Sequence, residues 1–234
     1  MLKSLAIVTL IIVLHPFGHL SAQAVTATEP TDEGDLRLTS IAHGTLMFEF
    51  AGTVIHVDPW SAADLSVYPQ ADWVFVTHEH GDHFDPEGIA SVSSDETRVV
   101  APAVVGRELE DADVIGNGET RSFDTFEVEA VPMYNVHHER GVGNGYVFTF
   151  GRTRVYVAGD TGCTDEMRRM TDIDIAFLPM YAERTMTPEM AAECAMAFRP
   201  GILYAYHYRD DDPGIAERML ADTDIEVRVG APSP

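Results

Sequence analysis

A succession of short, β-rich apolar runs constrains the fold of this chain more than any other feature of its sequence. Runs of β-branched and aromatic residues bounded by Gly, Pro and Asp are typical of strands. They predict strands at Leu36–Ile41, Leu46–Phe50, Val54–Val57, Asp72–Thr77, Arg98–Ala101, Phe126–Val131, Tyr146–Phe150, Thr153–Ala158, Ile173–Leu178, Ile202–Tyr206 and Ile225–Val229. Ala51-Gly52 and Gly151-Arg152 each separate two of these runs and predict tight hairpins.

Helices are expected between the later strands. Ala103–Glu110 and Pro213–Leu220 have helical character. Thr187 and Pro188 supply an N-cap and a first-turn proline for a helix that runs through Phe198. Hairpins followed by strand–helix alternation predict an α/β protein in which helices cover two mixed sheets, a four-layer αββα sandwich.

The composition fits a single soluble domain. The 234 residues are 45% hydrophobic and 23% charged, without an internal repeat of fixed period. Lysine and arginine total 15 against 38 acidic residues, so the formal charge of −23 argues against electrostatic binding of nucleic acid. Cys163 and Cys194 are too few for a disulfide framework or a four-cysteine zinc site. Any metal must therefore be held by His and carboxylate side chains.

The N-terminus has the features of a secretory signal peptide. Lys3 supplies a positive start, Leu5–Leu14 is an apolar run, and Ala22 and Ala24 are the small residues that an export peptidase requires. The run is shorter than the roughly 20 residues that span a bilayer, which argues against a stable membrane anchor. The expected division of the chain is a cleaved signal peptide at residues 1–24, a flexible lead-in at 25–35 and the folded domain at 36–234. We therefore expect a periplasmic or secreted protein.

Cleavage would also change the charge. It would remove Lys3, the only lysine, and no acidic residue, so the formal charge would become −24 instead of −23. A lysine-free acidic surface suits a saline medium, where ions screen the self-repulsion. Codon bias explains the same composition equally well.

Three histidines and an aspartate lie within six residues, directly after the apolar run that ends the fourth predicted strand. In extended backbone, residues two apart point the same way, so His78 and His80 can bind one ion. Gly81 lets the chain turn, which would direct Asp82 and His83 at a second ion. Imidazole and carboxylate suit Zn, Mn or Fe, and two such ions can share and activate one water. The cluster predicts a two-metal site in preference to a His-rich surface turn.

Two further candidate ligands also follow strands. Thr153–Ala158 runs into Gly159 and Asp160, whose carboxylate could bridge both metals. Ile202–Tyr206 runs likewise into His207. Alone, Asp160 would suit an ordinary turn and His207 a structural histidine. Their placement at strand ends, like that of the six-residue cluster, favours metal binding.

The pattern His78-x-His80-x-Asp82-His83, with the later Asp160 and His207, resembles the metallo-β-lactamase superfamily from about Leu36 onward. More narrowly, the chain resembles the branch of metal-dependent hydrolases that includes the ascorbate-6-phosphate lactonases, and more distantly the N-acyl phosphatidylethanolamine phospholipase D group. The segments that carry the narrower resemblance are Ile41-Ala42-His43-Gly44-Thr45, Val57-Asp58-Pro59-Trp60, Leu178-Pro179-Met180 and Thr185-Met186-Thr187-Pro188-Glu189. The superfamily cleaves many kinds of bond, so the motif says little about the substrate.

The resemblance implies two divalent metal ions, with Zn expected and Mn or Fe as alternatives, and with Asp160 between them. The first ion would be held by His78, His80 and a histidine from the middle of the chain. The second would be held by Asp82, His83 and His207.

The middle histidine is ambiguous, because His137 and His138 are adjacent and successive extended residues cannot both face one site. The spacing from His138 to Gly141, followed by Gly143 and Gly145-Tyr146, best matches the branch that the chain resembles and favours His138. Asp58 resembles an aspartate that orients a ligand by hydrogen bonding without touching the metal. His43 matches an early histidine of the branch and could either line the pocket or be structural.

The implied activity is that of an exported metal-dependent hydrolase in which a metal-bound hydroxide cleaves a small ester, lactone or phosphoester. Asp82 would act as the catalytic proton acceptor if it is not fully committed as a ligand. A non-catalytic metal-binding protein is the main alternative, followed by a phosphodiesterase or nuclease and by a β-lactamase.

Several other residues could border such a site. They are Arg140, Tyr181, Arg184 and Tyr208, each of which could hold an anionic or polar substrate group. Arginines on an acidic protein also suit surface ion pairs. Cys163 follows Asp160 closely and is expected to be a small buried core residue. The substrate and the oligomeric state are not indicated by the sequence.

Overall fold

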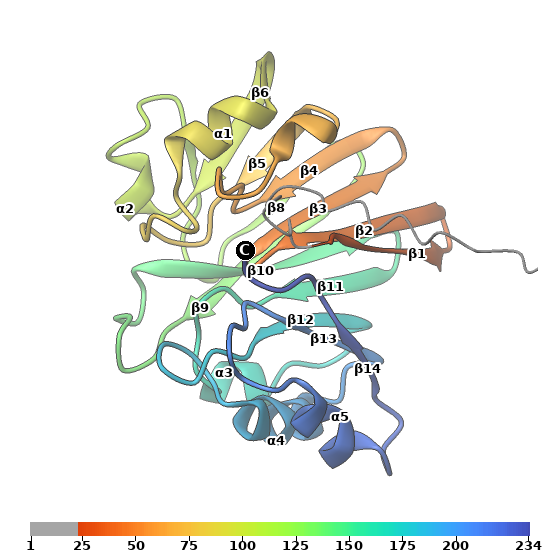
Figure 1. Ribbon diagram of the computed structural model, residues 1–234. Coiled ribbons are helices and arrows are strands. Elements are labelled where there is room, and N and C mark those ends of the chain that lie inside the picture. The colour runs from red at the N-terminus through yellow and green to blue at the C-terminus, as the bar shows by residue number, and fades with distance from the viewer. Residues whose placement is uncertain (1–22) are drawn as a thin grey trace, which may run out of the picture.

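Two seven-stranded sheets pack face to face in the computed structural model, which describes residues 23–234 (Figure 1). Helices cover both outer faces, so the predicted four-layer αββα sandwich is confirmed. The predicted signal peptide lies almost entirely outside the described residues. Within residues 23–234, no helix is long and apolar enough to cross a membrane.

The first sheet contains the N-terminal strands in sequence order. They are β1 (Val25–Thr31), β2 (Gly34–Ala42), β3 (Thr45–Phe50), β4 (Thr53–Val57), β5 (Ala71–Phe75), β6 (Ser93–Ala101) and β7 (Asp113–Val114). β1 to β4 form an antiparallel meander, and β4 to β7 are parallel. The predicted hairpin between β3 and β4 is confirmed, with φ of 50° at Ala51 and 85° at Gly52.

The second sheet repeats this plan. Its strands are β8 (Thr120–Ser122), β9 (Glu127–Met133), β10 (Gly143–Phe150), β11 (Thr153–Val157), β12 (Ile175–Pro179), β13 (Ile202–Tyr206) and β14 (Glu226–Val229). β8 to β11 are antiparallel, and β11 to β14 are parallel. In both sheets, therefore, the strands that follow the meander all point the same way.

The helices divide between the two outer faces (Figure 1). The short 3₁₀ helix η1 (Leu65–Val67), α1 (Pro86–Val92) and α2 (Ala103–Gly106) follow strands of the first sheet, and α3 (Asp165–Arg168), α4 (Pro188–Phe198) and α5 (Gly214–Leu220) follow strands of the second. α4 begins and ends as predicted, because the Thr187 hydroxyl accepts from the Met190 amide at 3.2 Å and Arg199 adopts a left-handed conformation.

Three apolar clusters hold the layers together. Aromatic side chains such as Phe48, Phe75 and Phe148 fill the space between the sheets. A second cluster joins the second sheet to α3, α4 and α5, and a third joins the first sheet to α1 and α2. Because apolar burial is spread over all three interfaces, most of the stability comes from strands and helices and little from the loops that carry the site.

The prediction of a flexible lead-in at 25–35 is wrong. Residues 25–31 form β1, which pairs with β2 from Val25 opposite Ser40 to Thr31 opposite Gly34. The polar composition suggested a coil, but the β-branched residues favour extended backbone, and Pro30 is tolerated because β1 is an edge strand.

The predicted helix at Ala103–Glu110 is shorter than expected, and the α-helices α1 and α3 were not predicted. α2 ends at Gly106, where a Cβ would lie 2.4 Å from a methyl of Val114, so the chain passes close to β7 at this point. α1 has the signals that mark a helix start, since the Asp85 side chain caps it and Pro86 opens its first turn.

The two cysteines form one disulfide. Cys163, predicted as a buried core residue, is half-buried and is bonded to Cys194 in α4. The bond ties the segment that follows Asp160 to the helical layer.

Candidate metal centre

The candidate ligands converge because each lies in a connection at the same edge of the two sheets. The six-residue cluster follows β5, His138 lies between β9 and β10, Asp160 follows β11, and His207 follows β13. Asp58 and His43, which follow β4 and β2, join them. Since the carboxyl ends of parallel strands meet at one sheet edge, the topology alone gathers residues that are distant in sequence.

The backbone is held in an uncommon conformation at three of these positions. His43, Asp58 and His207 have φ of 51°, 47° and 48°, in the left-handed region. Asp and His tolerate this region better than most residues, but it costs energy that the surrounding structure must offset. Gly44 adds a packing constraint, since a Cβ there would lie 2.9 Å from the His83 ring.

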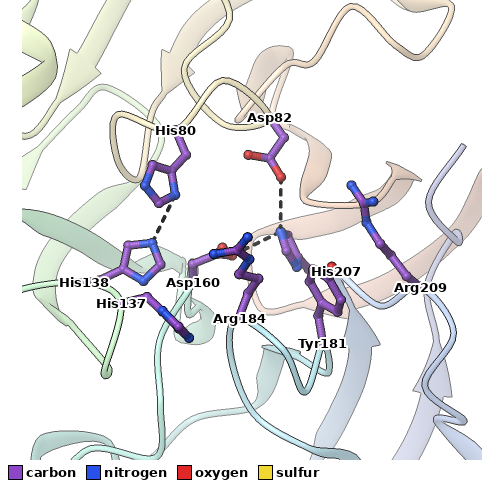
Figure 2. A pocket seen from close by; sticks show the side chains of 9 residues that line it. All are labelled: His80, Asp82, His137, His138, Asp160, Tyr181, Arg184, His207 and Arg209. Atoms are coloured by element: carbon purple, nitrogen blue, oxygen red, sulfur yellow. Dashed lines mark hydrogen bonds and ion pairs between the residues drawn. The ribbon is translucent and has the colours of Figure 1, made fainter.

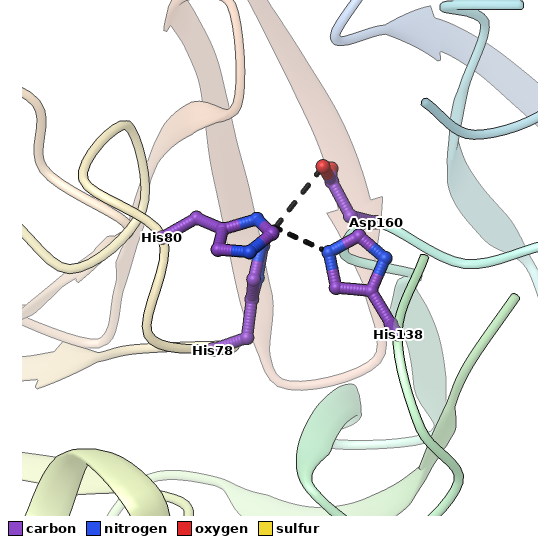
Figure 3. A group of neighbouring side chains, drawn as sticks. All are labelled: His78, His80, His138 and Asp160. Carbon is purple, nitrogen blue, oxygen red and sulfur yellow. Dashed lines mark hydrogen bonds and ion pairs between the residues drawn. The ribbon is translucent and has the colours of Figure 1, made fainter. Parts of the chain in front are cut away.

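The first group of candidate ligands consists of His78, His80, His138 and Asp160 (Figure 3). One ligand atom from each lies within 4.8 Å of the others. His80 Nδ1 is 3.2 Å from His138 Nε2, and His78 Nε2 is 3.9 Å from Asp160 Oδ2. Of the two adjacent histidines, the structure places His138 in this group and His137 outside it, on the pocket wall.

Hydrogen bonds fix which nitrogen of His78 faces the group. The Thr77 hydroxyl donates to Asp58 Oδ2 at 2.7 Å. Because a hydroxyl has one hydrogen, its contact of 3.0 Å with His78 Nδ1 is one in which the imidazole donates. His78 Nε2 is then unprotonated and directed at the group.

Asn135 does the same for His138. Its Oδ1 is 3.0 Å from His138 Nδ1 and also accepts the backbone amide of that residue at 3.1 Å. Its Nδ2 donates to the carbonyl of Asp160 at 2.9 Å. Sequence reasoning missed Asn135, because a turn residue gives no signal of the side chains that it contacts.

The second group consists of His83, His207 and the same Asp160. His83 Nε2 and His207 Nε2 lie 3.3 and 3.2 Å from Asp160 Oδ1. Asp82 is nearby, with Oδ2 at 3.7 Å from His207 Nε2. Asp160 is therefore the side chain shared by both groups.

Asp58 supports the second group as well as the first. Its Oδ2 is 2.7 Å from His83 Nδ1, and its Oδ1 accepts the Thr77 amide at 2.8 Å. A donating Nδ1 leaves His83 Nε2 unprotonated toward Asp160 whenever the ring is neutral. Asp58 is fully buried and is not among the residues that line the pocket.

His43 lies beside Asp82. The sequence had left open whether His43 lines the pocket or is structural. Its Nε2 is 3.2 Å from Asp82 Oδ2, and its Nδ1 is 2.5 Å from Ser233 Oγ. Ser233 donates to the Tyr208 carbonyl at 2.7 Å, so its oxygen accepts from His43. His43, Asp82 and His207 form a third cluster of potential ligand atoms.

The electrostatics reflect burial and close acid–base contacts. Burial lowers the pKa of His43 to about 4 and, aided by the charge of His83, holds the pKa of His78 well below its usual value. Burial opposes the charge of Asp160, but His207 and His83 outweigh it and keep the pKa of this carboxyl well below its usual range. The carboxylates of Asp160 and Asp58 likewise outweigh burial and raise the pKa of His83.

The polar atoms that face the two groups test whether the residues fit metal ions. Among residues 23–234, several buried side-chain atoms have no hydrogen-bond partner, and these include His78 Nε2, His83 Nε2, Asp160 Oδ1 and both ring nitrogens of His207. Buried polar atoms normally have hydrogen-bond partners, so a cluster of unpaired ones needs another partner, such as a bound ion, to offset its cost. Imidazole nitrogens around a shared carboxylate are a donor set that fits divalent Zn, Mn or Fe.

A pocket of about 410 Å³ opens onto both groups (Figure 2). Its lining consists of His80, Asp82, His137, His138, Asp160, Tyr181, Arg184, His207 and Arg209. Of the four residues that the sequence suggested for substrate contact, Tyr181 and Arg184 therefore line it. Arg140 instead pairs with Glu166 at 2.6 Å, and the Tyr208 hydroxyl donates to the Gly230 carbonyl at 3.0 Å.

Comparison with known proteins agrees with this geometry. The sequence profile of the β-lactamase superfamily domain matches residues 37–207. The chain is 29% identical over 199 residues to the UPF0173 metal-dependent hydrolase of Aeropyrum pernix, covering 74% of this chain and 82% of that protein. It is 26% identical over 223 residues to the UPF0173 metal-dependent hydrolase of Methanopyrus kandleri, covering 83% and 95%.

Solved structures extend the likeness to the fold. A protein of Parabacteroides distasonis, named as a candidate metal-dependent hydrolase, is 41% identical and superposes with a TM-score of 0.86 over 89% of this chain and 99% of that one. A metallo hydrolase from Ignicoccus hospitalis, 23% identical, shares the fold with a TM-score of 0.73 over 85% and 96%.

Proposed function

Because the chain belongs to the β-lactamase superfamily and is a metal-dependent hydrolase, we propose that it is exported and cleaves a small ester, lactone or phosphoester with two divalent metal ions. The resemblance to the ascorbate-6-phosphate lactonases is compatible with this proposal. The observation that carries it is the pair of ligand groups around Asp160, in which His78 Nε2, His83 Nε2 and Asp160 Oδ1 are buried without hydrogen-bond partners in residues 23–234.

The proposed division of ligands follows the two groups. His78, His80 and His138 would hold one ion, His83, His207 and Asp82 the other, and Asp160 would contact both. Zn is the proposed metal, with Mn and Fe as alternatives. Ions held there would lower the pKa of water toward neutrality and polarise the bond to be cleaved.

The protein's own side chains would position the reaction and move its proton. Asp82 lines the pocket, and its side chain is 29% exposed, so it is the carboxylate within reach of a substrate. Its Oδ2 faces His43 and His207, whereas its Oδ1 would accept the proton of the attacking water. Asp58 would keep His83 and His78 in one orientation throughout the reaction.

Two observations support export. Residues 1–24 have the charged start, apolar run and small residues of a signal peptide. The disulfide between Cys163 and Cys194 is the kind of bond that persists in an oxidising compartment. Intact-mass measurement of the exported protein should give a mature N-terminus near Val25, and a membrane-bound form that retains Met1 would contradict export.

The function is tested with protein purified without chelator and assayed on chromogenic esters, lactones, phosphodiesters and β-lactams. We expect turnover on an ester, lactone or phosphoester, its loss on dialysis against a chelator, and its recovery on addition of Zn, Mn or Fe. Bound metal without turnover on any member of the panel would favour a non-catalytic metal-binding protein.

A further inference from the structure

Most arginines of this acidic chain form ion pairs with carboxylates. In the described part of the chain, most form an ion pair, as Arg140 does with Glu166 and Arg154 with Glu129. Those that form none are Arg107, Arg168, Arg184 and Arg209. With 38 acidic residues against 15 basic ones, an arginine that forms no ion pair has donors left to bind another anion. Arg184 and Arg209 line the same pocket, which is the one at the candidate metal centre.

We propose that Arg184 and Arg209 form an anion-binding subsite, and that the substrate carries a carboxylate or phosphate group beside the bond that is cleaved. This inference rests on the proposed function, since it names the substrate class for the same pocket. A guanidinium presents paired N–H donors that match the oxygens of a carboxylate or phosphate, whereas a neutral ester offers it no comparable partner.

The backbone at Arg184 is fixed relative to the centre. Its amide donates to the Tyr181 carbonyl at 2.9 Å, and its carbonyl accepts from Asn135 Nδ2 at 2.9 Å. The same Asn135 Nδ2 donates to the Asp160 carbonyl, and Asn135 Oδ1 contacts His138. The Asn135 side chain therefore connects the backbone of Arg184 to Asp160 and His138 of the first ligand group.

Arg209 is placed by an aromatic ring. Its guanidinium carbon lies 5.4 Å from the centre of the Tyr181 ring, and that ring lies 6.1 Å from the His207 ring. The Tyr181 ring therefore lies between the arginine and the histidine. Such a stacking contact holds a cation without consuming its N–H donors.

Figure 2 shows Arg184 and Arg209 on either side of Tyr181. Both side chains point toward the part of the pocket that contains His207 and Asp82. Both arginines are exposed, so their donors are accessible from solvent. The pocket volume of about 410 Å³ suits a small molecule. An anionic group held at the rim would leave the rest of that molecule to reach the candidate metal ligands.

The test compares two esters of similar size with the metal-loaded protein, the anionic 4-nitrophenyl hemisuccinate and the neutral 4-nitrophenyl butyrate. We expect Arg184→Gln and Arg209→Gln each to lower the ratio of kcat/KM for the anionic over the neutral ester by about 10-fold or more, because a hydrogen bond to a charged group contributes about 1.5–3 kcal/mol. Arg107→Gln is the matched control, since Arg107 is exposed, forms no ion pair among residues 23–234 and lies outside the pocket. It should leave the ratio unchanged.

Calorimetric titration separates this inference from the proposed function. Methyl phosphate and monomethyl succinate are titrated into the metal-loaded wild type, the Arg184→Gln/Arg209→Gln double variant and the Arg107→Gln control, so that phosphate and carboxylate sources are distinguished. At least one anion should bind the wild type and the control about 10-fold or more tightly than the double variant. If the wild type cleaves neither ester, the proposed function fails while this binding result still decides the subsite. Equal anion binding by wild type and double variant, or an unchanged ester ratio, would overturn it.

Discussion

The two groups of candidate ligands share Asp160 but differ in how their other side chains are held. In the first group, His78 and His138 are each oriented by a hydrogen bond on the nitrogen that faces away from the site. In the second group, Asp58 orients His83, whereas His207 Nδ1 has no partner within residues 23–234. The first group is therefore better organised before any ion binds.

The second group also depends on more distant parts of the chain. Asp82 Oδ2 lies 3.2 Å from His43 Nε2, and His43 Nδ1 donates to Ser233, which is 190 residues away in sequence. Asp82 is more exposed than His43, as expected of a side chain that would meet substrate. The difference between the groups suggests a division of labour, in which the first anchors an ion and the second adapts during the reaction.

The largest effect is expected where both groups are disrupted. Asp160→Ala removes the shared carboxylate and should lower turnover by at least about 1000-fold, because transition-state stabilisation of several kcal/mol is lost. It should also lower bound metal while the fold survives, since the sheets are held by apolar burial. Metal analysis, circular dichroism and turnover of one preparation check this, and a full metal complement with full activity would refute a shared ligand.

Removing a ligand that belongs to the first group alone should weaken binding of the first ion more than binding of the second. His138→Ala should weaken binding of the first ion by at least about 100-fold, whereas His137→Ala should leave it within about twofold, because His137 lies on the pocket wall. The two variants are a matched pair that differ only in position. Loss of metal in His137→Ala with retention in His138→Ala would reverse the assignment.

A support shared by both groups should have an intermediate effect. Asp58→Asn removes the charge that His83 and Thr77 contact, so the affinity for both ions should fall by about 10- to 100-fold. Zinc titration against a competing chelator measures this. A decrease confined to one ion would show that Asp58 orients only one group.

Features that depend on residues close together in sequence could be predicted, whereas contacts between residues far apart in sequence could not. Strands such as Ile202–Tyr206 and the cap at Thr187 are local patterns, and both were predicted correctly. The family and the residues that the structure gathers around Asp160 could be predicted because their spacing is a motif. Asn135 and Ser233 could not, since their roles arise only when segments far apart in the chain meet.

The smallest effect is expected at the end of that chain of contacts. Ser233→Ala removes the acceptor of the His43 Nδ1 proton, which should change the second ion's affinity by only a few-fold, or about 1 kcal/mol. The first ion should be unaffected. Competitive titrations of the two ions check this, and an equal change in both affinities would contradict the separation of the groups.

Native mass spectrometry during a zinc titration, with hydrolysis assayed on the same samples, tests the two-ion account most directly. Two ions should bind each chain in resolved steps, the first about 10-fold or more tightly than the second, and full turnover should require the second. Saturation at one ion per chain with full turnover, or hydrolysis that persists after all metal is removed, would contradict a hydrolase built on two ligand groups around Asp160.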